Sequence, residues 1–205
     1  ILVNATTGRF EFSKLKTINK SKGSNESFMV LGKTLNKDSG VENIYFANSG
    51  FYTRTQGYLN PEYTKFSEGQ NDGNFRIYSL EGNANGMSFK RTIEMPKNGY
   101  KMIVEDRIVS SLNENVSITP YVVIERDDSV VEEAGLMYTY LGPVFSSTKD
   151  TYEKYDFDDI REASYQNKSY GGWVALIQHY FLSAWVPEKD EEYLYQGRYG
   201  ENLSL

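Results

Sequence analysis

Few residues of this 205-residue chain have the side chains that catalysis usually requires. His179 is the only histidine, and the chain has no cysteine. The lack of thiols excludes a disulfide framework, a zinc–cysteine site, a thiol nucleophile and an iron–sulfur cluster. Without a second histidine or a Gly-x-Ser-x-Gly elbow, a Ser–His–Asp arrangement has no candidate members. We therefore expect no catalytic residue, no bound metal and no cofactor.

The surroundings of His179 favour a structural role. The residue lies in the apolar run Trp173–Val186, in which both faces of an extended strand would be apolar. Such a run is typical of a strand buried on both sides. A histidine there is expected to be hydrogen-bonded within the packing, or to lie at a break between two strands. Adjacent carboxylates, such as Glu191 and Glu192, would point to opposite faces of a strand and could not act together.

Composition narrows the classes of function that remain. There are 28 acidic against 22 basic residues, a formal net charge of −6, which argues against nucleic-acid binding. Aromatic residues make up 15% of the chain, with 17 Tyr, 11 Phe and 2 Trp. Aromatic side chains suit β-sheets, although they could also line a cleft for sugars or peptides. The length and the lack of Pro-rich or Gly/Ser-rich linkers predict a single domain over residues 1–205.

The hydrophobic pattern has a period close to two, which predicts strands rather than helices. Gly86–Met95 and Tyr100–Val109 predict a hairpin around the turn Asn98–Gly99, with Met87, Phe89, Arg91 and Ile93 on one face. We expect further strands at residues 8–12, 28–31, 43–46, 75–80, 116–125 and 135–141, loops at 14–25 and 58–73, and a helical turn at 158–161.

No segment is long and apolar enough to span a bilayer, because even Trp173–Val186 falls short of the roughly 20 residues that a membrane helix needs. The chain starts at Ile1 in the middle of a pattern, so we expect it to be a domain of a longer protein.

The segment Gly171–Pro187, GGWVALIQHYFLSAWVP, resembles a signature of the YidC family of membrane-protein insertases. Two upstream segments, Gly135–Thr148 and Tyr152–Ile160, follow the order of the family. Three earlier segments resemble it more loosely: Ser27–Thr34, Ser67–Leu80 and Met87–Glu105.

This resemblance implies an all-β fold with little helix, a twisted two-sheet β-supersandwich similar to galactose mutarotases. It implies a periplasmic domain, incomplete at both ends relative to the family, of a multi-pass protein anchored in the bacterial inner membrane. The implied function is a non-catalytic docking or substrate-contacting module of an insertase and chaperone. Its implied partners are components of the Sec translocon and nascent membrane proteins, which the parent would insert with or without the translocon.

The motif residues are expected to be structural. Gly171 and Gly172 permit a tight turn, Trp173 and Trp185 bury large areas, and Pro187 ends the strand. The rest of the expected motif is Tyr180 and Phe181. The alternative is a carbohydrate-binding or aldose-epimerase-like protein of the mutarotase fold, which would need an acid and a base in one cleft.

Overall fold

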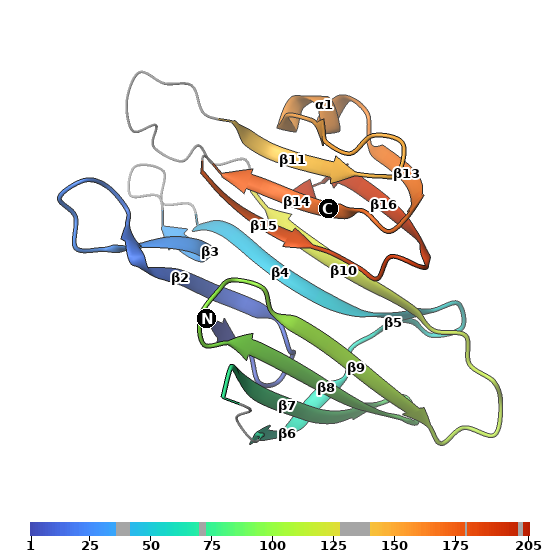
Figure 1. The fold of residues 1–205 in the computed structure, drawn as a ribbon. Helices are drawn as coiled ribbons and strands as arrows, with labels where there is room; N and C mark the ends of the chain where they lie inside the picture. Colours follow the sequence, from blue (N-terminus) through green and yellow to red (C-terminus); the bar gives the residue numbers. More distant parts are fainter. Residues whose placement is uncertain (36–41, 70–72, 128–139, 179, 201–202) are drawn as a thin grey trace. The chain divides into compact units, whose positions relative to one another are not determined.

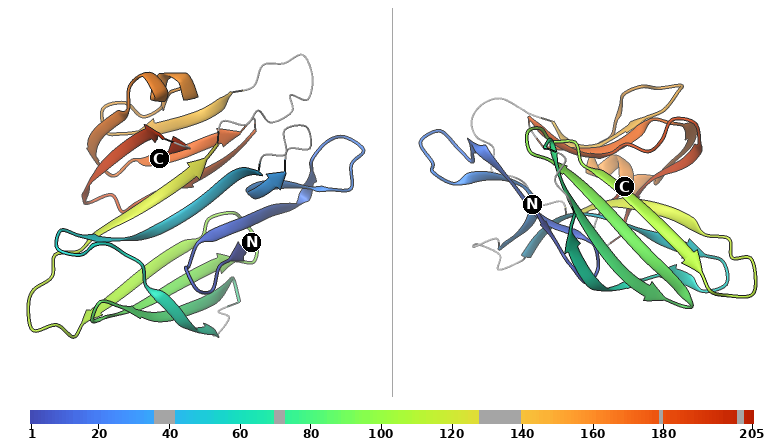
Figure 2. Two further views of the ribbon diagram at one scale, coloured as in Figure 1. Left: turned by 180° about the vertical axis from the view of Figure 1, so that it is seen from behind. Right: turned by 60° about the horizontal axis from the view of Figure 1, so that its bottom comes forward.

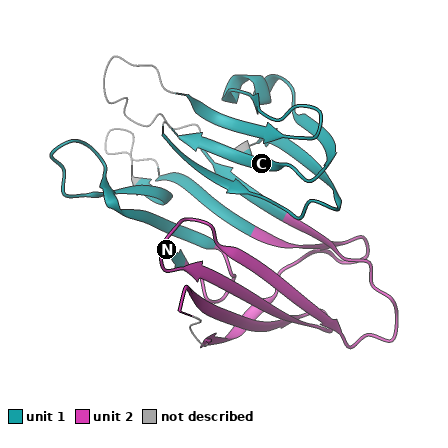
Figure 3. Cartoon of the chain, viewed as in Figure 1, with its two compact units in different colours: residues 1–2, 10–48, 122–205 teal, residues 3–9, 49–121 magenta. Residues whose placement is uncertain are grey.

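The computed structural model describes residues 1–35, 42–69, 73–127, 140–178, 180–200 and 203–205. The secondary structure of these residues is almost entirely antiparallel β-strand, which confirms the expected all-β fold class (Figure 1). The chain divides into two compact units (Figure 3). Unit 1 comprises residues 1–2, 10–48 and 122–205, and unit 2 comprises residues 3–9 and 49–121. That the whole chain behaves as a single domain stays a prediction.

Unit 2 is built on a four-stranded sheet in the order β6–β7–β8–β9. Its strands are β6 (Glu62–Glu68), β7 (Phe75–Ala84), β8 (Met87–Pro96) and β9 (Ile103–Ser110). The predicted hairpin is confirmed, because β8 and β9 pair from Met87 opposite Ser110 to Glu94 opposite Ile103. The short strand β5 (Gly57–Leu59) pairs with the end of β4 (Glu42–Thr53).

The core of unit 2 follows from the alternation along β8. Met87, Phe89, Arg91 and Ile93 are all buried, as the period of two predicts. Each apolar side chain of this size contributes roughly 1.5–3 kcal/mol when it is removed from water. The core cluster comprises Phe51, Leu59, Tyr63, Leu80, Met87 and Phe89.

Unit 1 contains most of a larger sheet and all of a smaller one. The larger sheet has the order β1–β2–β3–β4–β10–β17–β16–β13 and the smaller one β12–β11–β14–β15, and Figure 2 shows these strands from two further directions. The strands of the larger sheet not yet given are β1 (Leu2–Val3), β2 (Phe10–Asn19), β3 (Ser27–Leu35), β10 (Thr119–Arg126), β13 (Tyr165–Tyr170), β16 (Glu192–Tyr199) and β17 (Leu203–Ser204). Those of the smaller sheet are β11 (Leu141–Ser146), β12 (Glu153–Lys154), β14 (Trp173–Gln178) and β15 (Phe181–Trp185).

The two sheets of unit 1 pack through aromatic side chains. Phe145 of β11 stacks on Tyr165 of β13 with ring centroids 3.8 Å apart. Phe181 of β15 packs on Phe28 of β3 at 4.2 Å. Such contacts between inward faces are those of a sandwich.

The only α-helix in the described part of the chain is α1 (Phe157–Glu162), which confirms the predicted helical turn. It begins with a capping box, in which the Asp159 amide donates to the Asp156 side chain at 2.8 Å and the Asp156 amide donates to the Asp159 side chain at 2.9 Å. Ile160 anchors the helix and is buried.

Three expectations about local structure were wrong. Lys14–Asn19 belongs to β2 rather than to a loop, and the pairing of β2 with β3 includes register shifts that disturb the alternation. Within the expected loop 58–73 lies β6, whose residues are exposed except Tyr63 and therefore lack an apolar period. The third error concerns Trp173–Val186, which forms a hairpin rather than one strand buried on both sides. His179 and residues 135–139 lie outside the described residues.

Candidate functional surface

The hairpin β14–β15 is preceded by a close approach of two backbone segments. Gly171 and Gly172 have φ angles of 60° and 90°, a region that favours glycine. A Cβ atom at Gly172 would overlap the carbonyl oxygen of Ser146. The Tyr195 hydroxyl donates a hydrogen bond to the Gly171 carbonyl oxygen at 2.6 Å. The glycine pair therefore lets the hairpin start directly against β11.

The inward face of the hairpin fixes it to the larger sheet of unit 1. The Trp185 indole Nε1 donates to the Val123 carbonyl oxygen at 3.1 Å, and its ring lies edge-on to Phe10 at 6.1 Å. The Tyr45 hydroxyl donates to the Leu176 carbonyl oxygen at 3.4 Å. Burial raises the pKa of Tyr45 to about 12, so this hydroxyl stays protonated in the folded chain.

The outward face of the hairpin is apolar. It is exposed along β15, whereas on β14 Ala175 of this face is buried. Leu182 lies opposite Ile177 and is 55% exposed, and Val186 farther along the same face is 68% exposed. Beside β14, the exposed ring of Tyr152 lies 6.1 Å from that of Trp173. We call this set the hairpin surface: Tyr152, Trp173, Ile177, Leu182, Ala184 and Val186. Tyr152, Leu182, Ala184 and Val186 of this set are exposed, and Trp173 and Ile177 are half-buried. Exposed apolar side chains that gather in one region are a common mark of interaction sites.

The structure divides the seven motif residues among different positions. Gly171 and Gly172 form the close approach, Phe181 and Trp185 face inward, and Trp173 lies on the outward face. Tyr180 is in the turn and is 76% exposed, and Pro187 follows β15 and is half-buried. The two tryptophans therefore do not share one face, because the chain reverses between them.

A second feature of unit 1 is an open hollow of about 480 Å³ beside α1, lined by Glu153, Lys154, Tyr155, Asp159, Glu162 and Ala163. The Tyr165 hydroxyl donates to Glu153 Oε2 at 2.9 Å. Burial, together with the nearby Glu153 carboxylate, raises the pKa of Tyr165 to about 12. Across the described ranges, acidic and histidine side chains form no group that could hold a metal ion. Of the carboxylates here, Glu153 accepts bonds from tyrosines and Asp159 takes part in the helix cap.

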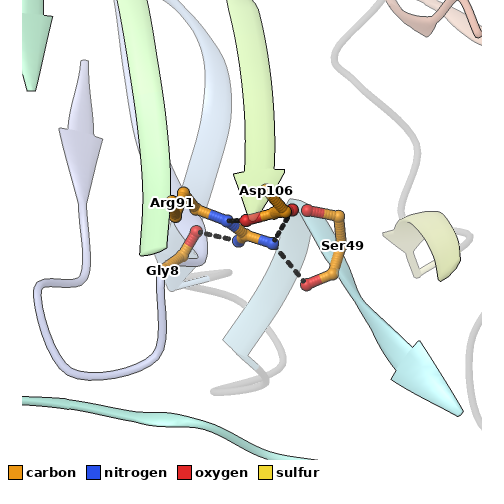
Figure 4. A network of polar contacts seen from close by, with 4 residues as sticks. All are labelled: Gly8, Ser49, Arg91 and Asp106. Atoms are coloured by element: carbon orange, nitrogen blue, oxygen red, sulfur yellow. Dashed lines mark hydrogen bonds and ion pairs between the residues drawn. The ribbon is translucent and has the colours of Figure 1, made fainter. Parts of the chain in front are cut away.

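Unit 2 contains a buried ion pair that the sequence reasoning did not single out (Figure 4). Arg91, only 1% exposed, binds Asp106 through two hydrogen bonds, from Nε at 2.8 Å and from Nη2 at 2.9 Å. It also donates to the carbonyl oxygens of Gly8 at 3.2 Å and Ser49 at 3.3 Å. Burial alone would lower the pKa of Arg91, but the Asp106 carboxylate more than offsets this and raises it. The signal in the sequence was an arginine on the apolar face of β8.

Arg91 has a structural position rather than a catalytic one. Its donors join β8 and β9 to the end of β4 and to the turn at Gly8, all within unit 2. Its planar guanidinium suits this role because it offers several donors in a fixed geometry.

Comparison with known proteins decides the family. The family model for the YidC periplasmic domain matches residues 2–204. The chain belongs to this family. Similar proteins include the membrane protein insertases YidC of Shewanella loihica, 33% identical over 53% of this chain and 20% of the relative, and of Pasteurella multocida, 26% identical over 93% and 35%. The YidC insertase of Haemophilus influenzae is 29% identical over 73% of this chain and 29% of the relative.

The chain spans about a fifth to a third of the length of these YidC relatives. In the described residues, no helix has the length and apolar character needed to cross a membrane. As a YidC periplasmic domain, the chain corresponds to the periplasmic part of a membrane-anchored bacterial protein.

Proposed function

We propose that the chain is a non-catalytic docking or substrate-contacting module of a YidC-type insertase, located on the periplasmic side of the inner membrane. In this role it assists the insertion and folding of inner-membrane proteins, with or without the Sec translocon. The family match over residues 2–204 supports the parent's role. The hairpin surface supports docking, because it exposes large apolar side chains on a rigid sheet.

The chemistry of the hairpin surface suits partners that bring apolar side chains of their own. Covering it would remove apolar area from water at roughly 25 cal/mol per Å². Nascent membrane proteins offer such side chains, as do the translocon components that handle them. The buried charge of Arg91 and the half-buried charge of Asp106 are engaged in joining strands, which also supports a scaffold role.

Photocrosslinking in the full-length parent tests this function. A photoreactive amino acid at Leu182 or Val186 should capture nascent membrane proteins or translocon components during insertion. The matched control is Tyr100 of unit 2, which is 77% exposed but lies outside the hairpin surface. Tyr100 should give few or no adducts. Absence of adducts from both Leu182 and Val186, or equal capture from Tyr100, in a parent that still inserts substrates would contradict docking through the hairpin surface.

A second candidate is carbohydrate binding, which an aromatic cluster of unit 2 favours. Tyr52, Tyr58 and Tyr121 meet edge to face, with centroids 5.4 Å apart in both pairs. Exposed aromatic rings with polar tips can hold sugars. Aldose binding and anomerisation should be assayed for the chain and for His179→Ala. A rate that this substitution abolishes would favour the epimerase-like alternative over the docking role.

A further inference from the structure

Strand β15 is the last strand of the smaller sheet, in which no described strand lies beyond it. It is joined to β14 by a two-residue connection between Gln178 and Phe181, which lie opposite each other. Hydrogen-bonded and non-bonded pairs alternate along an antiparallel ladder. Since such a connection closes on a bonded pair, the backbone N–H and C=O groups of Leu182 and Ala184 point away from β14.

The side chains along this edge do not protect it. Natural edge strands are commonly blunted by lysine, proline or a bulge. β15 instead presents Leu182 and Ala184 as its exposed residues, and Val186 continues the same face. The edge thus combines apolar side chains at every second position with backbone groups that are not paired by any described strand, which are the two requirements for an added strand.

The charged residues that follow β15 indicate which residues should flank the apolar part of an added strand. Directly after Pro187 come Glu188, Asp190, Glu191 and Glu192, all exposed, with Lys189 as the one basic residue among them. Unit 1 as a whole has 20 Asp and Glu against 13 Lys and Arg, whereas unit 2 has 8 against 9. Basic residues on a partner would therefore be attracted to the end of β15.

We propose that β15 binds an extended segment of a partner polypeptide by antiparallel strand addition. The segment has apolar side chains at alternate positions and lysine or arginine at its amino-terminal end, which lies beside residues 188–192. This inference rests on the proposed docking function and names the class of partner.

The test uses fluorescence anisotropy of the chain with a labelled synthetic peptide, two lysines followed by alternating valine and threonine. In a comparison peptide, the backbone amides that face β15 are N-methylated. Losing two backbone hydrogen bonds should weaken binding roughly tenfold or more. A third peptide has the lysines at the carboxyl end and should also bind more weakly. Equal affinity for the methylated peptide, or no binding of any peptide, would overturn the proposal.

Variants of the chain test the same edge from the other side. Ala184→Pro removes an outward-facing N–H, and Leu182→Lys places a charge on the edge while leaving the backbone intact, so a folding defect in one does not remove the test. Both should weaken peptide binding. Leu194→Lys, at an exposed leucine of β16, is the matched control and should not. If Leu194→Lys weakened peptide binding equally, the peptide would be adsorbing non-specifically to the surface, which would contradict strand addition.

Two other occupants of the edge give different results. If Ala184→Pro abolishes a concentration-dependent dimer in sedimentation, a second copy takes the edge. If the Leu182 and Ala184 amides of the full-length parent are already protected from hydrogen exchange without peptide, the parent's own polypeptide covers it. Either result overturns the proposal. Crosslinks from Leu182 that persist in the Ala184→Pro parent would also contradict strand addition, yet leave the docking function standing.

Discussion

At the scale of single residues, the Arg91–Asp106 pair joins several segments of unit 2. A buried charge is expensive unless it is paired and hydrogen-bonded, and Arg91 has bonds from three nitrogens to Asp106, Gly8 and Ser49. The bonds to Asp106 join β8 to its hairpin partner β9, and those to Gly8 and Ser49 connect it to segments distant in sequence. The residue therefore contributes specificity of arrangement as well as stability.

Removing this arginine should be strongly destabilising. Arg91→Met leaves the Asp106 carboxylate without its main partner, so we expect the free energy of unfolding in urea to fall by about 3–5 kcal/mol. The control is Lys90→Met at the next position, because Lys90 is exposed and its ion pair with Glu81 contributes at most about 1 kcal/mol. Adding Asp106→Leu to Arg91→Met should recover part of the loss. A small effect of Arg91→Met alone would contradict the assigned role.

The buried Tyr45 hydroxyl predicts a loss of stability in alkali. Its pKa is raised to about 12 in the folded chain by burial, against about 10 when unfolded. The stabilisation is fully present below about pH 10 and declines as the pH rises towards about 12, since the unfolded chain loses the proton first. Urea unfolding at about pH 9 and about pH 11 should show a smaller decline for Tyr45→Phe than for the unchanged chain. Equal declines would show that Tyr45 does not titrate this way.

At the scale of elements, the approach of Gly172 to β11 sets the position of the hairpin. Gly172→Ala should lower the free energy of unfolding by about 2 kcal/mol or more, because it adds steric overlap with Ser146 to an unfavourable φ. Gly57→Ala isolates the backbone effect, since Gly57 has φ +73° and no atom within 4 Å of an added Cβ, and should cost about 1 kcal/mol. Gly200→Ala has open space and serves as the neutral control. If all three substitutions changed the free energy of unfolding equally, the steric role of Gly172 would be contradicted.

The elements also show what the sequence could and could not predict. The β8–β9 hairpin was predictable because one face is buried and the turn Asn98–Gly99 separates the strands. β6 was not, because all its side chains except Tyr63 are exposed and its strand structure comes from pairing with β7. Around the β14–β15 hairpin, the motif residues were recognised, but an apolar run alone does not reveal where it reverses. That reversal places Trp173 and Trp185 on opposite faces.

At the scale of the whole molecule, the single-domain prediction can be tested by unfolding. β4 and β10 each contribute residues to both units without an interruption of the strand. We therefore expect one cooperative transition in urea, with the same midpoint by circular dichroism and by tryptophan fluorescence, although both tryptophans lie in unit 1. Two separate midpoints would show that the units unfold independently.

The place of β17 has a consequence for the order in which the chain can fold. This two-residue strand lies between β10 and β16 and pairs Glu125 with Ser204. If the chain emerges amino-terminus first, β10 is available long before β17. Closing the long loop between these two strands is slow. The larger sheet is complete only when residues 203–204 have arrived. Until then this edge of β10 is unpaired, and misassembly or the binding of a holding chaperone would occur there.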